Sequence, residues 1–128
     1  MTLARARSRL GGRAEEHGRA GEIVCVDGEL GVVLWSSLEA CDVWIGDDRT
    51  KRISADEIVT AAAPPGSPVA SLAEDARAFG RLEEGQPVVV DGAAGTLVEK
   101  CRFGGLVARP DGKILAVGFR RFARSASS

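Results

Sequence analysis

The sequence predicts a mainly β protein made of two copies of one small unit, and three observations lead to this prediction. Residues 21–33 recur at residues 85–97 without a gap, at an offset of 64 residues. In both copies a short run of β-branched residues ends in Asp-Gly, which is typical of a tight hairpin. The chain of 128 residues also has 16 glycines, which indicates frequent tight turns. This length suits one domain or two very small ones.

The repeat is carried by identical residues at matching positions. The identical pairs are Gly21 and Gly85, Val24 and Val88, Val26 and Val90, Asp27 and Asp91, Gly28 and Gly92, and Gly31 and Gly95. At the same offset Val43 matches Val107, Asp47 matches Asp111, and Ile53 is replaced by Val117. The register therefore continues through a whole unit, and we infer an internal duplication.

Each copy is predicted to contain a series of short strands. In the first copy these are residues 22–26, 31–35, 41–45 and 50–53, and in the second copy residues 87–90, 95–99, 105–109 and 113–117. Ser54 and Glu57 form an S-x-x-E pattern, which predicts one helical turn before a fifth strand at Ile58 and Val59. Four strands, a helical turn and a fifth strand predict a small closed barrel in each copy.

The strand at residues 105–109 does not reveal which of its faces points inward. Its alternation allows either Leu106 and Ala108, or Val107 and Arg109, to face the core.

The two copies are joined by residues 61–84, where three prolines close together interrupt any ladder or helix and predict a linker. A helix is predicted to begin near Pro68, with Ser67 as its cap, and to end at Gly80. Its apolar positions recur at helical spacing: Val69, Leu72, Ala73, Ala76 and Phe79. We expect this face to lie against one barrel or between the two, with Glu74, Asp75 and Arg77 outward.

This order of elements resembles the SH3-like barrels, a group that includes KOW and Tudor-type modules. The resemblance covers residues 21–60 and 85–124. It is carried by Gly21, Val24, Val26, Gly28 and Gly31, and by Gly85, Val88, Val90, Gly92 and Gly95. It implies two tandem small barrels, and it assigns no catalytic or ligand-binding residue, because these positions belong to the scaffold. A single larger closed sheet is the main alternative.

The ends of the chain are predicted to be tails. Residues 1–20 are basic and lack periodicity, and residues 125–128 are short and polar, so we expect both to be flexible. The N-terminal stretch lacks the apolar region of a secretory signal, and no apolar run approaches the length of a membrane span. We therefore expect a cytoplasmic protein without a membrane segment. The excess of Arg over Lys, together with abundant Ala and Gly, is typical of a GC-rich bacterial genome.

The residue inventory argues against an enzyme. His17 is the only histidine and lies in the predicted N-terminal tail, so we expect no Ser/His or Cys/His nucleophile pair. No glycine-rich phosphate-binding loop is present, and no cofactor is expected. Asp47 and Asp48 are adjacent acids in a turn, where a solvated pair is the usual outcome, so we expect no metal site.

The three cysteines, Cys25, Cys41 and Cys101, lack C-x-x-C spacing and are expected to be reduced thiols. Cys25 lies in an apolar strand and is predicted to be part of the core. Cys101 lies between Lys100 and Arg102, whose charges would lower its pKa and make it the most reactive thiol. An ordinary structural thiol is the alternative.

The two copies carry opposite charge. Residues 21–60 hold nine acids and three bases, whereas residues 85–124 hold three acids and seven bases. One interpretation is a nucleic-acid surface on the second copy, with Phe103, Phe119 or Phe122 stacking on bases. Its candidate residues are Lys100, Arg102, Arg109, Lys113, Arg120 and Arg121. A second interpretation is that the two copies face each other, within one chain or across a dimer. A third is two solvated faces.

The tryptophans distinguish the first copy, since Trp35 and Trp44 have Glu99 and Ala108 as their counterparts. Strand alternation places Asp42 and Trp44 on the face opposite Val43, so Trp44 would face solvent unless the linker helix covers it through Leu72 or Phe79. A groove for a basic ligand beside an exposed Trp44 is the functional alternative.

The sequence therefore predicts a non-catalytic binding or adaptor module that contacts a protein partner, or a second copy of itself. The candidate contact residues are Trp35, Trp44, Asp42, Asp47 and Asp48. The competing prediction is a KOW-like protein that binds RNA or the ribosome through the basic second copy. Charge removal at Arg102, Arg109, Arg120 and Arg121 should abolish the second activity only, and Trp44→Ala the first only.

Overall fold

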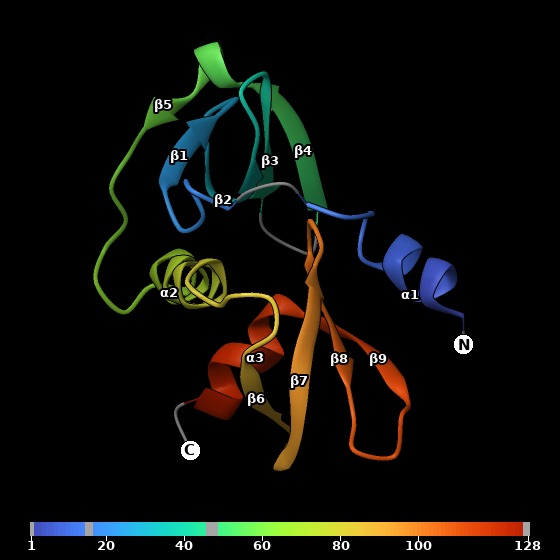
Figure 1. Ribbon diagram of the computed structural model, residues 1–128. Helices are drawn as coiled ribbons and strands as arrows, with labels where there is room; N and C mark the ends of the chain where they lie inside the picture. The colour runs from blue at the N-terminus through green and yellow to red at the C-terminus, as the bar shows by residue number, and fades with distance from the viewer. Residues whose placement is uncertain (1, 15–16, 46–48, 127–128) are drawn as a thin grey trace.

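The computed structural model describes residues 2–14, 17–45 and 49–126, and the side chains up to residue 122. It contains two antiparallel sheets with helices between and beside them (Figure 1). The first sheet has five strands in the order β4-β3-β2-β1-β5, and the second has four in the order β6-β7-β8-β9. The prediction of a mainly β protein is confirmed. Two closed barrels are not confirmed. Among the described residues, the two edge strands of each sheet do not pair with each other, so both sheets are open.

The strands lie close to their predicted positions. The first sheet consists of β1 (Ile23–Val26), β2 (Glu29–Ser36), β3 (Ala40–Ile45), β4 (Arg49–Ser54) and β5 (Val59–Thr60), with the 3-10 turn η1 (Ala55–Glu57) before β5. The second consists of β6 (Pro87–Val90), β7 (Ala93–Lys100), β8 (Gly104–Ala108) and β9 (Ile114–Gly118). Ser54 precedes η1 as predicted, but its side chain makes no capping hydrogen bond.

The two sheets have the same strand registers at the 64-residue offset. Val24 is opposite Gly31, and Val88 is opposite Gly95. The register shift between Val33 and Trp35 recurs between Leu97 and Glu99. The hairpin turns also agree, since Asp27 and Asp91 have φ angles of 50° and 52° and the glycine after each has 81° and 79°. Equivalent residues of the two sheets can therefore be compared position by position.

The linker helix forms as predicted. Helix α2 spans Pro68–Gly80, and the Ser67 hydroxyl accepts a hydrogen bond from the Ala70 main-chain N–H at 3.3 Å. It lies between the two sheets (Figure 1), and its buried side joins the central cluster of the protein. That cluster contains Val32 and Leu34 of β2, Leu72, Ala73, Ala76 and Phe79 of α2, Val88, Val90, Leu97, Val107 and Val117 of the second sheet, and Phe119 and Phe122.

The described N-terminal residues form a helix and a hydrogen-bonded segment, where the sequence predicted a tail without periodicity. Helix α1 (Leu3–Arg9) packs on the outer face of the second sheet, with Ala6 and Leu10 buried against Leu106. The segment after α1 is held by main-chain hydrogen bonds, because Phe103 donates to the Leu10 carbonyl and Ala14 donates to the Lys100 carbonyl, both at 3.1 Å. The outer face of the sheet is apolar here, and α1 removes it from water.

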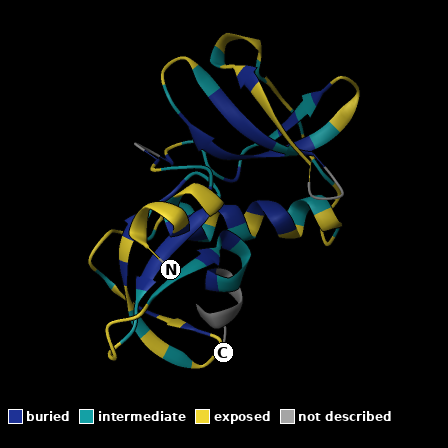
Figure 2. Ribbon diagram, turned by 90° about the vertical axis from the view of Figure 1, so that its right-hand side faces the viewer, coloured by how far each residue is buried: buried dark blue, intermediate teal, exposed yellow. Residues whose placement is uncertain are grey.

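The sequence left open which face of β8 is buried. In the structure both faces are, because α1 covers one and the central cluster covers the other. Leu106 contacts α1, whereas Val107 points into the central cluster. Figure 2 shows the buried residues concentrated where helices and sheets meet, and the exposed ones at the outer turns.

The second sheet departs from the first after its last strand. In the first sheet η1 leads into β5, which pairs with β1. At the equivalent place the chain continues as helix α3 (Phe119–Ala126), and no strand pairs with the outer side of β6 among the described residues. Phe119 and Phe122, one helical turn apart, are buried in the central cluster and hold α3 against the sheet.

No helix in the described part of the chain is both long enough and apolar enough to cross a bilayer.

Candidate functional site: the junction around Trp35

Trp35 lies where the two sheets meet, and it is only 6% exposed. It follows the register shift in β2 and is opposite Asp42 of β3. The bulge turns the strand so that both side chains point toward the loop between β7 and β8. Arg102 comes from that loop and forms an ion pair with Asp42 at 2.6 Å. One acid of the first sheet and one base of the second are thus joined within the chain.

Two guanidinium groups lie over the Trp35 ring. Those of Arg52 and Arg102 are 5.5 and 5.4 Å from its centroid, within the range of cation–π attraction. Arg102 also donates to the Gly11 carbonyl at 3.3 Å, which fixes its position. The Trp35 indole N–H is buried without a hydrogen-bond partner among the described residues. Cation–π contacts and packing therefore hold the ring in place, without a hydrogen bond from its N–H to the described residues.

A pocket of about 510 Å3 opens beside this ring, and we call it the junction pocket. Its lining residues are Gly11, Arg13, Trp35, Ser37, Leu38, Glu39, Arg52 and Arg102. The lining includes three arginines and one glutamate; Arg13 and Arg102 are paired with carboxylates of the protein, and Arg52 is exposed. Leu38 is 95% exposed on the turn between β2 and β3 and provides an apolar contact at the rim. A cationic wall, a rigid aromatic ring and an exposed aliphatic side chain are the features of a recognition site.

The position of Trp44 differs from that of Trp35. It is half-buried, and its ring packs edge-on against Phe119 at 5.8 Å between centroids. The ring contact comes from α3, where we expected the linker helix. Neither tryptophan is fully exposed. Asp42 is 2% exposed and paired, while Asp47 and Asp48 lie outside the described residues.

Four of the six basic residues proposed for nucleic-acid contact have partners inside the protein. The Lys100 ammonium group donates to the Gly80 and Leu82 carbonyls at 3.0 and 2.9 Å, beyond the C-terminus of α2. Arg102 pairs with Asp42, Arg120 pairs with Asp75 at 2.9 Å, and Arg121 pairs with Asp91. Phe119 and Phe122 are 4% exposed and cannot stack on bases.

Arg109 and Lys113 lie at the hairpin between β8 and β9, where the Arg109 main-chain N–H donates to the Lys113 carbonyl at 2.8 Å. Lys113 is exposed and Arg109 is half-buried. Both lie away from the junction and from α2.

A buried carboxylate that the sequence did not single out attaches α1 to the second sheet. Glu99 occupies in β7 the position that Trp35 occupies in β2, and it is 5% exposed. Arg7 donates to both of its oxygens at 2.6 and 3.0 Å, and Arg13 donates at 3.1 Å. These two guanidiniums lower the pKa of Glu99, with the Arg7 hydrogen bond contributing most. The only signal in the sequence was a carboxylate that follows the apolar pair Leu97 and Val98.

His17 is not in a tail, which corrects the prediction. It is 9% exposed and packs edge-on against Phe79, with 5.2 Å between centroids. Its Nδ1 lies 2.7 Å from the Leu34 carbonyl of the first sheet, and its Nε2 lies 3.0 Å from the Cys101 carbonyl. Both nitrogens therefore face main-chain carbonyls, and the imidazole connects the two sheets.

Cys101 is not a reactive thiol, because it is fully buried. Burial, followed by the charge of Glu99, raises its pKa to about 11, which overcomes the flanking bases. Cys25 was predicted to be core but is half-buried, since Val24 and Val26 take the inward positions of β1. All three cysteines are free.

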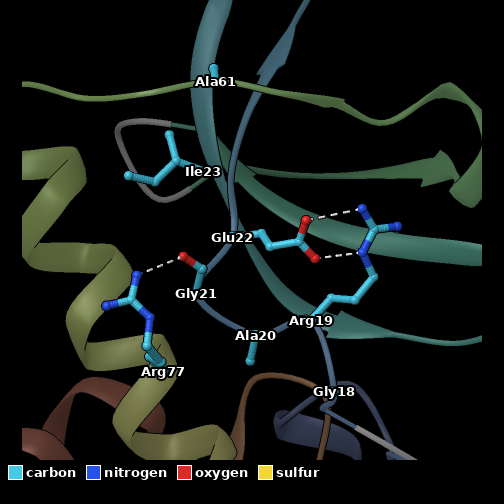
Figure 3. Close-up of a pocket in the computed structure, with 8 residues that line it drawn as sticks. All are labelled: Gly18, Arg19, Ala20, Gly21, Glu22, Ile23, Ala61 and Arg77. Atoms are coloured by element: carbon cyan, nitrogen blue, oxygen red, sulfur yellow. Dashed lines mark hydrogen bonds and ion pairs between the residues drawn. The ribbon is translucent and has the colours of Figure 1, made fainter.

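A second pocket, of about 450 Å3, lies where the chain enters β1 and is shown in Figure 3. Its charged residues bind one another or the main chain. Arg19 pairs with Glu22 at 2.5 Å, and Arg77 donates to the Gly21 carbonyl at 3.2 Å. Figure 3 shows these two interactions along the pocket wall. Arg19, Glu22 and Arg77 all have protein partners, whereas the junction pocket also offers the exposed Arg52 beside an aromatic ring, so this second pocket is the weaker candidate.

Within the described residues, no group of three or more His, Cys, Asp or Glu side chains is placed to hold a metal ion. No protein-family profile, curated protein or solved structure matches this chain.

Proposed function

We propose that this protein is a non-catalytic binding module and that the junction pocket receives an acidic segment of a protein partner. The observation that carries the proposal is that Arg52 and Arg102 lie over the ring of the buried Trp35, in a pocket that Arg13 also lines. Arginine is suited to carboxylates because its planar group can donate two parallel hydrogen bonds. The lining favours an anionic ligand, which reverses the charge expected from the acids of the first copy.

The pocket residues differ in how free they are to meet a ligand. Arg102 is bound to Asp42, and Arg13 is bound to Glu84 and Glu99. Arg52 is exposed on β4, and its guanidinium group lies over the Trp35 ring. We therefore expect Arg52 to contribute most to ligand contact, and Arg13 and Arg102, whose charges are already paired, to shape the pocket. Leu38 adds an apolar contact for the same segment.

The test is a titration that follows tryptophan fluorescence. The probes are a short peptide that alternates Glu and Leu, and its counterpart that alternates Lys and Leu. We expect the acidic peptide to bind and Arg52→Glu to weaken it at least about tenfold. Arg81→Glu is the matched control, because Arg81 is also an exposed arginine but lies at the end of α2. Equal binding of both peptides, or equal loss in both variants, would contradict the proposal.

A nucleic-acid-binding function is a second candidate, and one observation favours it. Helix α1 packs on β8 and β9, and it carries Arg5 and Arg9 on its exposed side. Arg109 and Lys113 lie on the hairpin that joins the same two strands. The test is fluorescence anisotropy of short labelled RNA and DNA across a salt series. Binding that weakens steeply with salt and is lost in a variant with Gln at these four positions supports this function.

We also propose that the two sheets derive from one duplicated unit of the SH3-like type. The proposal is supported by the shared registers, by the paired positive φ angles at Asp27 and Asp91, and by the close approach at Gly31 and Gly95. A Cβ atom at either glycine would lie 2.6 Å from a valine methyl and 3.0 Å from a main-chain oxygen. The same contact in both sheets is expected if both inherited one packing solution.

A further inference from the structure

The face of the first sheet that α2 covers has an exposed counterpart in the second sheet. Helix α2 lies against β1 and β2, where Ile23, Val32 and Leu34 pack into the central cluster. Val32 and Leu34 are buried and Ile23 is half-buried. Their equivalents at the 64-residue offset are Pro87, Thr96 and Val98. All three equivalents are exposed, although the strand registers are the same.

A pair of matched glycines shows the same difference independently. Gly21 and Gly85 have φ angles of 92° and 93°, and the N–H of each donates to the neighbouring strand, at 2.8 and 2.6 Å. A Cβ atom at Gly21 would lie 2.8 Å from the Arg77 Cβ atom and 2.9 Å from the Ala73 carbonyl oxygen, both in α2. A Cβ atom at Gly85 would have no described atom within 4 Å apart from its chain neighbours. The second sheet therefore keeps the local backbone against which a helix packs in the first.

The exposed counterpart is an uncharged surface on adjacent strands, and we call it the open face. It consists of Pro87, Val89, Ala94, Thr96 and Val98. Val89 is directly opposite Ala94, and Pro87 is opposite Thr96, so these side chains are neighbours. Val89 and Val98 are 47% and 41% exposed. Exposed apolar side chains that gather on one face are typical of a contact surface.

The exposed strand β4 shows that this composition is not general in the protein. Its residues Arg49, Lys51 and Arg52 are exposed and charged. Charged side chains are the usual composition of a strand surface that faces water. The absence of charge is therefore a property of the open face in particular.

Helix α1 borders the open face. It packs on β8 and β9, and its Arg7 reaches Glu99 on the adjacent strand β7. Leu3 precedes Arg7 by one helical turn, so the two lie on the same flank of α1. Leu3 is apolar but 44% exposed. A second helix on β6 and β7 would therefore lie beside α1 and have Leu3 within its reach.

We infer that the open face is a docking site for an amphipathic helix of a partner protein, which lies on β6 and β7 as α2 lies on β1 and β2. The occupant is a helix because this fold already covers the equivalent face with one. Helix α2 buries Leu72, Ala73, Ala76 and Phe79 on one side, so the partner helix carries Leu, Ala or Phe at the same spacing. Arg77 donates to the Gly21 carbonyl, and a basic residue of the partner has the Gly85 carbonyl as its equivalent acceptor.

This inference goes beyond the proposed function, since no residue of the open face lines the junction pocket. A second copy of this chain is not the expected occupant. The apolar side of α2 is buried within each copy, and Phe119 and Phe122 of α3 are buried as well. Each copy thus keeps the apolar sides of these two helices for its own core.

The differences between the two faces predict the strength of binding. Thr96 replaces a valine of the first sheet, and Val98 replaces a leucine, so the open face offers less apolar area than the face under α2. The contact is also smaller than a standard stable interface, which buries about 1,600 Å2. We therefore expect reversible binding with a dissociation constant of about 10 to 500 µM.

Fluorescence anisotropy of a labelled peptide with the intact protein tests this inference. The probe is residues 67–81 of this chain, stapled as a helix between two exposed positions. We expect it to bind, and Val98→Asp to weaken binding at least about tenfold. Val89→Asp makes the same change on the neighbouring strand and serves if the first variant does not fold, which circular dichroism checks. The matched control is Val59→Asp on β5, where the valine is 61% exposed, and it should bind as the wild type does.

A second variant should strengthen binding, which misfolding cannot explain. Thr96→Val restores the residue that Val32 represents in the first sheet, and we expect it to tighten binding about threefold. Arg52→Glu should leave peptide binding unchanged, which separates this inference from the proposed ligand of the junction pocket.

Three results would overturn the inference. One is no binding at about 500 µM protein, or equal binding of a peptide with the same residues in an order without helical spacing. Another is binding that neither Val98→Asp nor Thr96→Val changes, because the peptide would then bind elsewhere or displace α2. The third is self-association of the protein alone, measured by sedimentation velocity, that Val98→Asp weakens, because the open face would then bind a second copy.

Discussion

Arg102 joins the two sheets through one side chain that forms an ion pair, stacks on two rings and donates to a main-chain carbonyl. Its pair with Asp42 is largely buried, with side-chain exposures of 24% and 3%. Removing one member of a buried pair leaves the other charge without compensation, which costs several kcal/mol. The guanidinium also lies 5.3 Å from the Phe103 ring centroid. The main role of Arg102 is therefore structural, because its contacts lie within the protein.

We predict that Arg102→Ala lowers the free energy of unfolding by about 3 kcal/mol, because Asp42 is left buried and unpaired. Arg52→Ala, which loses an exposed cation–π contact with the same ring, should cost less than about 1 kcal/mol. Urea denaturation followed by fluorescence measures both. Equal costs would mean that the ion pair adds nothing to the ring contact.

His17 makes stability depend on pH near neutrality. Burial lowers its pKa and outweighs the hydrogen bond to Leu34, which acts in the opposite direction. Because the folded pKa lies below the unfolded one, the unfolded chain binds more protons as the pH falls. We predict that stability is constant above about pH 7 and declines below about pH 6.5, by at most about 1.4 kcal/mol per pH unit.

Denaturation at a series of pH values between about 8 and 5 measures this decline. His17→Gln should remove the slope in that range. The chain has one histidine, so the imidazole resonances in an NMR titration report its pKa directly. A His17 pKa above that of the unfolded chain would reverse the sign and contradict the prediction.

The flanking bases in the sequence indicated that Cys101 would be the most reactive thiol. The structure leads us to predict that Cys25 reacts before Cys101. Cys25 is half-buried, whereas Cys101 is buried and its pKa is raised to about 11. At pH near 8 we expect iodoacetamide to modify Cys25 first and to reach Cys101 only after unfolding. Peptide mapping after brief labelling identifies the site. Early modification of Cys101 would mean that the β7–β8 loop opens in solution.

At the scale of elements, local signals predicted the structure well where neighbours in sequence determine it. Ser67 and the spacing of Leu72 and Phe79 predicted α2, and it forms as expected. Helix α1 was missed because only Ala6 of its seven residues is buried, so it has no apolar stripe. The helix is stabilised by packing against Leu106, which lies about a hundred residues later in the chain.

The same limit explains the differences at the candidate site. Sequence alternation indicated that Trp44 needs a cover, but not that α3 provides it. Trp35 and Glu99 occupy equivalent positions, and each contacts arginines from outside its own sheet. Which arginine reaches which strand depends on how the sheets are placed around α2. No local pattern contains that information.

We predict that the attachment of α1 depends on its single buried position. Ala6→Asp places a charge at a fully buried site and should release α1, whereas Ala4→Asp changes an exposed position and should not. Limited trypsin digestion tests this, because α1 and the segment after it are rich in arginine. Faster cleavage after the arginines of residues 5–13 is expected in Ala6→Asp only. Equal cleavage would show that the Glu99 ion pairs alone hold α1.

At the scale of the whole molecule, the central cluster makes the two sheets one cooperative unit. It contains residues of β2, α2, α3 and four strands of the second sheet, so neither sheet can unfold without exposing core surface of the other. We predict a single unfolding transition. Tryptophan fluorescence reports on the first sheet, where both tryptophans lie, and exchange of the Leu97 amide reports on the second. Transitions that do not coincide would contradict this.

The docking of α1 on β8 and β9 has a consequence for the order in which the chain can fold during synthesis. Residues 3–10 receive their binding surface only when residues near Ala116 have been made. At about 5 to 20 residues per second, α1 waits about 5 to 20 seconds. During that interval Leu10 is exposed beside several arginines, and Leu34 has only α2 of its final cluster to pack against. The docking of α1 therefore follows the formation of β8 and β9, although α1 precedes them in the chain.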